Sequence, residues 1–555
     1  MNDLNLVAAG FPPGGMAGNP VPGRPMRWAP PLVLLLLLAC LHGCATTIPG
    51  ADYPKKPSVA FADPQATRLG KGLAERAQRT DGQSGFHIFN VGVDGLLMRL
   101  EMINAAERSL DLEYYIFRGD ESGHLIMDAL VKAAQRGVRI RVLVDDGETI
   151  PGDEQVLALS GHESIQIRVF NPWKYRGHST VLRGTEFLLR HARLDYRMHN
   201  KMLLVDDAAA LVGGRNIGDQ YFQIDPQSQF ADDDVFVSGF LVAQMASKFD
   251  EFWNSALAIP AQALVHGHSQ GRDSSHTARA SARSRKARTS GFDYAERLAA
   301  DQPLAGILSG EVPLTWAPAQ FVSDSPDKKS VIDGARVGDL MFEPVAKLAR
   351  QATAELLIVS PYFVPSKDEL ALIKSSRGKG VGVRVLTNSL ESNPDTAAHA
   401  GYTHYRVQLL QEGVTLNEVR SLLGDTRGSG QSRKISRYGN FALHGKLYVM
   451  DRSKLVIGSM NFDSRSRRLN TEMSLIIDSG ELARQEAGRF ELMVRKENSY
   501  SVGLRDPDAQ GPSGKLTWST VENGHPVEYE SEPARSGWQR LESRLLALLP
   551  LDPEL

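Results

Sequence analysis

The sequence predicts an α/β fold in which two domains of the same kind follow one another along the chain. Three observations support this: the composition, an internal repeat of strand and helix patterns, and a polar motif found once in each repeat. The 555 residues are 42% hydrophobic and 23% charged, an ordinary globular composition with enough chain for two or more cored domains. The net charge of -2 lacks the broad basic excess of proteins that follow a phosphate backbone, so no nucleic-acid partner is expected.

The strand and helix patterns repeat between the two halves of the chain. The first half reads AERSLDLEYYIF, then a helical run ending in LVKAAQRG, then VRIRVLVDD. The second half reads ATAELLIVSPYFV, then ELALIKSSRGKG, then VGVRVLTNS. A strand, helix and strand in each half predict parallel βαβ units with helices on the sheet faces. The predicted domains are residues 85–258 and 336–499.

A polar motif recurs at the same place in each repeat. HNKMLLVDDAAALVGGRNIGDQY and HGKLYVMDRSKLVIGSMNFDSRS share a His, a Lys two residues later, an Asp five beyond that, and an Asn 17 after the His. The motif regions are residues 193–220 and 438–465. Residues i and i+2 of a strand share a face, so each His and its Lys should project into one site. The matched residues are His199, Lys201, Asp206 and Asn216 in the first repeat and His444, Lys446, Asp451 and Asn461 in the second.

These residue types suit attack on a phosphodiester. The reaction needs a nucleophile and a proton donor for the leaving alkoxide, and histidine can serve as either because its unperturbed pKa is about 6.5. Lysine ammonium groups and asparagine amides can hold the nonbridging oxygens, so neither a metal nor another cofactor is expected. Asp206 and Asp451 each end a strand at a turn, where Asp is favoured for turn hydrogen bonds, and a supporting role is expected for both.

The paired motifs resemble those of the phospholipase D superfamily, and the resemblance extends from about Gly85 to Ser499. It implies two tandem α-β-α sandwich domains related by pseudo-two-fold symmetry, with one active site at their interface. It also implies that one histidine attacks phosphorus to form a phosphatidyl-histidine, while the other protonates the leaving alcohol and then activates the incoming one. By analogy His199 is the nucleophile and His444 the acid/base, with the opposite order left open.

The resemblance also assigns supporting residues. Ser459 matches a phosphate-contacting hydroxyl, and Glu472, 28 residues after the motif histidine, matches a carboxylate that orients a histidine. The first repeat departs from this pattern, because Gly214 replaces the serine and a glutamine stands at the glutamate offset. The segment QIDPQSQF looks like an insertion that would move the carboxylate to Asp232 or to Asp234.

The first 44 residues predict export and lipid attachment. The apolar run 28–41 follows two arginines and matches the hydrophobic region of a secretory signal, with a marginal transmembrane anchor as the alternative. LHGC, ending at Cys44, resembles the lipobox of bacterial lipoproteins; Cys40 is a second candidate, and Met26 an alternative start. Residues 45–84 would then be a tether. We expect a bacterial cell-envelope protein anchored by a lipidated Cys44, in the inner or the outer membrane.

Two further segments lie outside the predicted domains. Residues 259–335 form a linker with a Ser/Arg-rich disordered insertion at 268–290, whose alternative role is attachment to anionic lipid. Residues 500–555 form a C-terminal extension that contains an amphipathic helix candidate, WQRLESRLLALLP. Its apolar stripe is expected to dock on the protein body rather than lie in the membrane. The stripe consists of Trp538, Leu541, Leu545 and Leu549.

Several features limit the range of possible substrates. The export signal places the site beside phospholipid, and one chain carries both motifs. The strings MHNKMLLVD, VGGRNIGDQYF, FNPW and GSMNFDSRSRRLNTE resemble bacterial cardiolipin synthases, particularly the lipoprotein-like C type. That resemblance implies transfer of a phosphatidyl group to phosphatidylglycerol at a membrane surface, from a second phosphatidylglycerol or from phosphatidylethanolamine. The alternatives are a membrane-anchored phospholipase D that releases phosphatidic acid, and an exported nuclease.

Overall fold

The computed structural model describes residues 48–77, 82–147, 159, 162–177, 179–225, 228–264, 301–424, 440–506 and 514–549. The predicted export signal, Cys44 and the Ser/Arg-rich insertion therefore lie outside the described residues. The chain divides into a unit of residues 1–47 and a unit of residues 48–555, and every described element belongs to the second unit. In that described part of the chain, no helix is both long enough and apolar enough to cross a bilayer.

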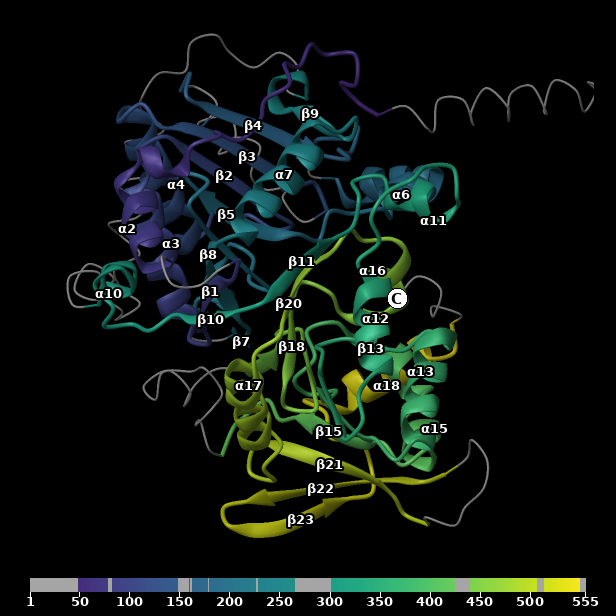
Figure 1. Ribbon diagram of the computed structural model, residues 1–555. Helices are drawn as coiled ribbons and strands as arrows, with labels where there is room; N and C mark the ends of the chain where they lie inside the picture. Colours follow the sequence, from purple (N-terminus) through teal and green to yellow (C-terminus); the bar gives the residue numbers. More distant parts are fainter. Residues whose placement is uncertain are drawn as a thin grey trace, which may run out of the picture. The chain divides into compact units, whose positions relative to one another are not determined.

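The first repeat forms a nine-stranded sheet in the order β10-β1-β8-β6-β5-β2-β3-β4-β9 (Figure 1). Strands β2, β3 and β4 run parallel, and helix α4 (Glu121–Gln135) connects β2 to β3, which confirms the predicted βαβ unit. The motif strands β5 and β6 are antiparallel. The strands are β1 (Ser84–Phe89), β2 (Ser109–Tyr114), β3 (Arg139–Asp145), β4 (Ile165–Phe170), β5 (Lys201–Val205), β6 (Ala209–Gly213), β8 (Asp234–Gly239), β9 (Ala258–Pro260) and β10 (Thr315–Ala317).

The second repeat forms a ten-stranded sheet in the order β11-β20-β18-β17-β12-β14-β15-β21-β22-β23. Strands β12, β14 and β15 run parallel, with helix α13 (Lys367–Gly378) between β12 and β14. The strands are β11 (Ala319–Ser323), β12 (Glu355–Val359), β14 (Gly382–Asn388), β15 (Thr415–Val419), β17 (Leu447–Met450), β18 (Lys454–Gly458), β20 (Met473–Ile477), β21 (Ser499–Leu504), β22 (Leu516–Glu522) and β23 (His525–Tyr529).

The two sheets share one strand order. The series β1-β8-β6-β5-β2-β3-β4 of the first sheet corresponds to β11-β20-β18-β17-β12-β14-β15 of the second, which confirms the tandem-repeat fold. The chain passes from one sheet to the other at Pro318, between β10 and β11, inside the segment expected to be a linker. The C-terminal extension contributes β22 and β23 to the second sheet.

One continuous core holds the repeats together. Helices α7 (Leu241–Asn254) and α17 (Gly480–Met493) follow the last common strand of each repeat, and their apolar stripes join a single buried cluster with side chains of both sheets. A small sheet takes β7 (Ser228–Ala231) from the first repeat and β16 (Asn440–Leu443) from the second. The two motif regions therefore have fixed positions relative to each other. The helical core residues are Val242, Met245, Phe249, Trp253, Leu482, Phe490 and Met493.

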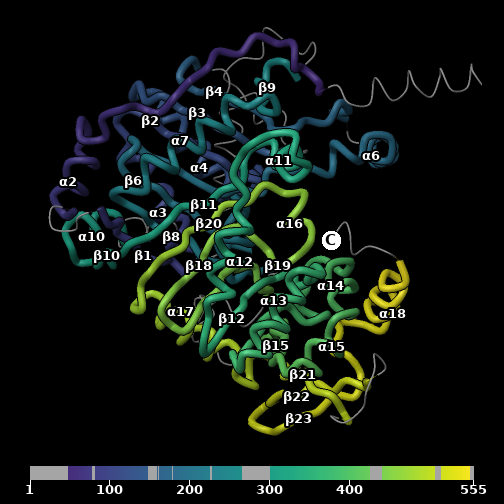
Figure 2. The backbone as a smooth tube through the Cα atoms, turned by 45° about the vertical axis from the view of Figure 1, so that its right-hand side comes forward, coloured from purple at the N-terminus to yellow at the C-terminus, as the bar shows by residue number. Residues whose placement is uncertain are grey.

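The remaining elements cover the sheets or connect their strands (Figures 1 and 2). They include η1 (Pro64–Ala66), α2 (Arg68–Ala77), α3 (Gly92–Ala105), α6 (Thr180–Leu194), η2 (Asp219–Tyr221), η3 (Ala261–Ala263), α10 (Pro303–Ser309), α11 (Lys328–Ile332), α12 (Phe342–Arg350), β13 (Phe363–Val364), α14 (Thr396–Thr403), α15 (Arg406–Gln411), β19 (Phe462–Asp463), α16 (Ser464–Arg468) and α18 (Gly537–Leu546).

The C-terminal amphipathic helix does not dock through its apolar stripe. Helix α18 contacts α14, but Trp538 is 72% exposed and the other stripe residues are exposed as well. The opposite face is held instead, because Ser543 is buried and Gln539 Nε2 donates a hydrogen bond to the Leu390 carbonyl at 2.7 Å. Polar contacts therefore decide which face of α18 meets the protein.

Candidate active site

Each motif histidine lies against a carboxylate from the other repeat. His199 Nδ1 lies 2.9 Å from Glu472 Oε2, and His444 Nδ1 lies 2.5 Å from Asp232 Oδ2. All four side chains are buried. The backbone shows the same exchange between the repeats. The His199 N–H donates to the carbonyl of Thr471, the residue before Glu472, and the His444 N–H donates to the carbonyl of Ala231, the residue before Asp232. The structure thus brings both motifs into one site at the interface of the repeats.

Strand register identifies Asp232, rather than Asp234, as the counterpart of Glu472. Asp234 lies opposite the last residue of β6, and Ser474 lies opposite the last residue of β18. Asp232 and Glu472 each stand two residues before these equivalent positions. Asp234 instead forms a buried ion pair with Arg99, whose Nη1 lies 2.7 Å from its carboxylate.

The glycine of the first repeat has a steric cause. The Ser459 hydroxyl donates to Glu472 Oε2 at 2.5 Å. At the matching position, a Cβ on Gly214 would lie 2.2 Å from Asp232 Oδ1. The position of the Asp232 carboxylate therefore requires glycine at 214, whereas Glu472 accepts the hydroxyl hydrogen of Ser459. Ser459 is fully buried behind Glu472 and is not among the described residues that line the pocket, so its position differs from the one expected for a phosphate-contacting group.

The two motif lysines accompany their histidines. Lys201 Nζ donates to the His199 carbonyl at 2.7 Å, and Lys446 Nζ lies 2.8 Å from His444 Nδ1. Burial lowers the pKa of both ammonium groups, that of Lys446 to about 8, while the nearby carboxylates oppose the shift. Lys446 therefore keeps its positive charge at neutral pH.

The two histidine–carboxylate pairs differ in their electrostatics. Burial, reinforced by the two lysines, lowers the pKa of both imidazoles, that of His444 to about 3. Burial also raises the pKa of Glu472 to about 7. For Asp232 burial acts in the same direction, but Lys446 and His444 outweigh it and hold the pKa of that carboxyl below its usual value. At neutral pH both imidazoles are thus uncharged, and Asp232 is fully ionised.

A hollow of about 600 Å³ opens onto both histidines and takes its walls from both repeats. Both motif asparagines line this hollow, but their hydrogen bonding differs. Asn216 is engaged with the protein, since its Oδ1 accepts the Ile116 N–H and its Nδ2 donates to the Tyr221 hydroxyl. Asn461 Oδ1 is buried and has no hydrogen-bond partner among the residues that the structure describes.

The lining residues that the sequence did not predict include Tyr115, Arg118, Tyr362 and Arg465. Each repeat places one of the tyrosines just after its first parallel strand, in EYYIF and SPYFV, and this repeated aromatic could have indicated them. Lys201 Nζ lies 5.4 Å from the centre of the Tyr115 ring. The arginines add positive charge to the pocket wall.

Asp206 and Asp451 lie at the far ends of the motif strands, outside the pocket lining. The Asp206 carboxylate accepts the three backbone N–H groups that lead into β2, those of residues 107 to 109. Asp451 accepts the equivalent N–H groups that lead into β12. Asp206 therefore links the end of β5 to the start of β2, and Asp451 links the end of β17 to the start of β12.

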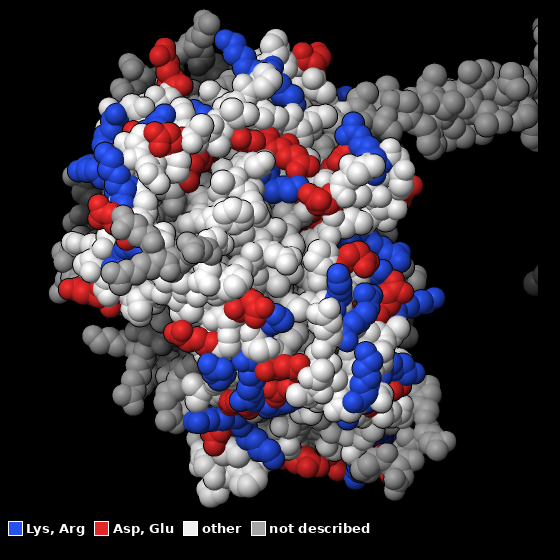
Figure 3. All heavy atoms as spheres, in the orientation of Figure 1, with Lys and Arg blue, Asp and Glu red and all other residues white. Residues whose placement is uncertain are grey.

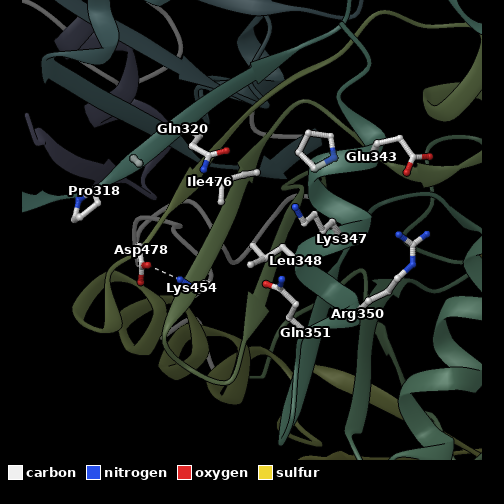
Figure 4. Close-up of a pocket in the computed structure, with 12 residues that line it drawn as sticks. Pro318, Gln320, Glu343, Lys347, Leu348, Arg350, Gln351, Lys454, Ile476 and Asp478 are labelled. Carbon is white, nitrogen blue, oxygen red and sulfur yellow. Dashed lines mark hydrogen bonds and ion pairs between the residues drawn. The ribbon is translucent and has the colours of Figure 1, made fainter.

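A larger hollow, of about 790 Å³, lies beside β11, β18, β20 and α12 and contains none of the matched His, Lys, Asp and Asn residues of the two motifs (Figure 4). Lys454 of this hollow is paired with Asp478. Within the described residues, no group of three or more His, Cys, Asp or Glu side chains is placed to hold a metal ion. The shared pocket is therefore the candidate active site.

Comparisons with known proteins identify the family of the chain. The family model described as "Cardiolipin synthase, PLD-like domain" matches residues 100–253 and 345–494. Cardiolipin synthase C of Escherichia coli K12 is 32% identical over 485 residues, covering 87% of this chain and 99% of that protein. Major cardiolipin synthase ClsA of Bacillus subtilis 168 is 25% identical over 420 residues, covering 75% of this chain and 70% of that protein. Phosphatidylserine synthase of Haemophilus influenzae Rd KW20 aligns over 78% of this chain and 92% of that one at 14% identity, but its TM-score of 0.48 is too low to bear on fold or function.

Proposed function

Because the chain belongs to the cardiolipin synthase family with phospholipase D-like domains, we propose that it transfers a phosphatidyl group to phosphatidylglycerol and so makes cardiolipin. The observation that carries the proposal is the shared pocket, onto which both motif histidines open, each supported by a carboxylate of the other repeat. Two acid–base groups on one phosphate suit a displacement in two steps.

The two histidine pairs suit different roles. A neutral His199 that donates its Nδ1 proton to Glu472 leaves the Nε2 lone pair free to attack phosphorus. Burial lowers the pKa of His444, but the ionised Asp232 and the negative charge of a bound phosphate both oppose this shift, so His444 takes up a proton when the lipid binds. We therefore assign His199 as the nucleophile and His444 as the acid/base.

In the first step the bond between His199 Nε2 and phosphorus forms, and the bond from phosphorus to the headgroup oxygen breaks. His444 supplies the proton that this oxygen takes up. In the second step His444 removes a proton from a hydroxyl of phosphatidylglycerol, whose oxygen attacks phosphorus and releases His199. The products are cardiolipin and the free headgroup alcohol, which is glycerol or ethanolamine according to the donor.

The positive and amide groups of the pocket hold the nonbridging oxygens. Lys201 and Lys446 lie beside their histidines, and Asn461, whose amide NH₂ group can donate to phosphate, lines the same hollow as Asn216. Such groups stabilise charge that grows in the transition state, and one donor is typically worth about 10²- to 10³-fold in rate.

The acceptor decides between transfer and hydrolysis. If water rather than a lipid hydroxyl reaches the phosphohistidine, the product is phosphatidic acid. The nuclease alternative has less support, since acidic and basic side chains are interspersed on the face drawn in Figure 3. For location we keep the proposal drawn from the sequence, a cell-envelope protein tethered through Cys44.

Product analysis tests the proposal. The purified protein is incubated with vesicles of phosphatidylglycerol, with and without phosphatidylethanolamine, and the lipids are identified by mass spectrometry. Cardiolipin is expected, and the His199→Ala and His444→Ala variants should produce none. Phosphatidic acid as the sole product would refute the synthase assignment, and cleavage of DNA without any lipid turnover would favour the nuclease.

A further inference from the structure

Helix α6 turns its apolar face to solvent and its charged face to the protein. Leu188 is 80% exposed, and Val181, Leu182 and Leu189 are exposed beside it. The Arg183 guanidinium, in contrast, lies over the ring of Trp173 at 4.6 Å. On the same inner face, Glu186 accepts backbone N–H groups at 2.8 Å, and Arg193 donates to Asn171 Oδ1 at 2.6 Å. A helix that faces water normally has the reverse arrangement, so the outer face of α6 fits an apolar partner.

Helix α18 repeats this arrangement at the other end of the chain. Trp538, Leu541, Leu545 and Leu549 form an exposed stripe, while the inner face is fixed by polar contacts. Both ends of α18 are held, because His404 Nε2 lies 2.8 Å from the Ala547 carbonyl and Gln539 is bonded to the Leu390 carbonyl. The stripe therefore faces outward on a fixed helix.

Both helices lie beside the candidate active site. Glu542 and Leu546 of α18 line the pocket. Helix α6 ends directly before Asp195, which pairs with the pocket residue Arg465 at 2.6 Å. In Figures 1 and 2 the two helices lie on the same side of the described unit, α6 above and α18 below, with α16 between them in height. The two apolar faces thus flank the pocket.

We propose that the outer faces of α6 and α18 dock on a phospholipid bilayer and bring the pocket to the level of the lipid headgroups. The inference rests on the proposed function, because the phosphate of a membrane lipid has to reach two buried histidines. Interfacial helices bury their apolar face about 5–10 Å into the boundary between headgroups and acyl chains. Tryptophan favours that depth, which matches the position of Trp538 at the start of the stripe.

The charges on α6 and α16 suit phospholipid. No carboxylate is among the exposed side chains of α6, and α16, between the two helices, carries three arginines. Arg465 and Arg467 are paired with carboxylates, whereas Arg468 is exposed. An anionic bilayer surface attracts such groups.

Surface-dependent activity provides the first test. In the full chain, Leu188→Ser with Leu189→Ser is assayed on phosphatidylglycerol vesicles and on short-chain, monomeric phosphatidylglycerol. On vesicles we expect the rate to fall at least about tenfold, because removing even one buried leucine side chain weakens binding by about this factor. On the monomer we expect a rate within about twofold of wild type. The matched control changes Val59 and Phe240 to Ser, two exposed apolar residues outside both helices, and should keep both rates.

The outcomes separate the two proposals. An unchanged rate of the double leucine variant on vesicles would overturn the docking surface while leaving the proposed function intact. A full chain that turns over neither substrate would instead refute the proposed function, and the docking surface is then judged by the fluorescence measurement that follows.

Fluorescence tests the surface without any turnover. Vesicles with brominated acyl chains should quench Trp538, so the quenching should fall in Trp538→Phe and keep its wild-type extent in Trp316→Phe, which removes a tryptophan of β10. Quenching that is equal in all three proteins would overturn the proposal. A dimer in lipid-free buffer that the double leucine variant dissociates would assign the face to a second copy of the chain and would overturn it as well.

Discussion

The Glu472→Gln substitution removes the negative charge behind His199 while preserving the size of the side chain. Both carboxylate oxygens lie within 3.0 Å of His199 Nδ1, and Oε2 also accepts the Ser459 hydroxyl. A glutamine keeps one acceptor oxygen and presents an NH₂ donor in place of the other. The amide oxygen can still accept from His199 Nδ1, but that hydrogen bond no longer involves a charge.

The expected magnitude follows from that contact. A hydrogen bond to a charged group contributes about 1.5–3 kcal/mol, which corresponds to a fall in kcat of about 10- to 150-fold. Glu472 is fully buried, so a neutral amide avoids the cost of burying a charge. We expect the free energy of unfolding in urea to change by less than about 1 kcal/mol.

The pH profile distinguishes an electrostatic role from a merely structural one. With a pKa of about 7, Glu472 is mainly ionised above neutral pH, so the wild-type rate should fall as pH drops through about 7. Glutamine does not titrate, and the variant should lose this acid limb while its rate stays low. The measurement is the initial rate of cardiolipin formation between about pH 6 and 8 at constant ionic strength.

The matched control is Asp232→Asn on the other histidine. Because the pKa of Asp232 lies below its usual value, this variant should lower kcat and leave the limb near neutral pH in place. A Glu472→Gln enzyme with the wild-type kcat and the wild-type limb would show that Glu472 does not support His199, and the reasoning would fail.

Three further substitutions test other parts of the site. Asp206→Ala leaves three backbone N–H groups without their acceptor and should lower the free energy of unfolding in urea by about 2–4 kcal/mol; a lost rate at unchanged stability would contradict the supporting role. Gly214→Ser should displace the Asp232 carboxylate and lower kcat at least about tenfold, and a wild-type rate would refute the steric argument. Lys446 has a pKa of about 8, so its charge and the wild-type rate should fall as pH rises through that value. Lys446→Arg should move this alkaline limb upward, and a limb that stays in place would exclude Lys446 as its source.

Local patterns in the sequence were enough to predict the duplicated α/β fold and the residues of the two motifs. Strand and helix periodicities are local properties of the sequence. The duplication also preserved the offsets from His to Lys and from His to Asn, so the two motifs align directly. The alternation of side chains along a strand then placed each His beside its Lys. The turn role of Asp206 also followed from its place at a strand end.

Which carboxylate supports which histidine depends on contacts between the two repeats. His199 and Glu472 lie 273 residues apart, and offsets counted along one repeat cannot show that the partners are exchanged. The register of β8 against β6 selected Asp232 over Asp234, because the insertion before it had changed the spacing. The sequence likewise did not predict that the apolar stripe of α18 faces outward. Periodicity identifies an apolar face, but the contacts of the opposite face decide where it points.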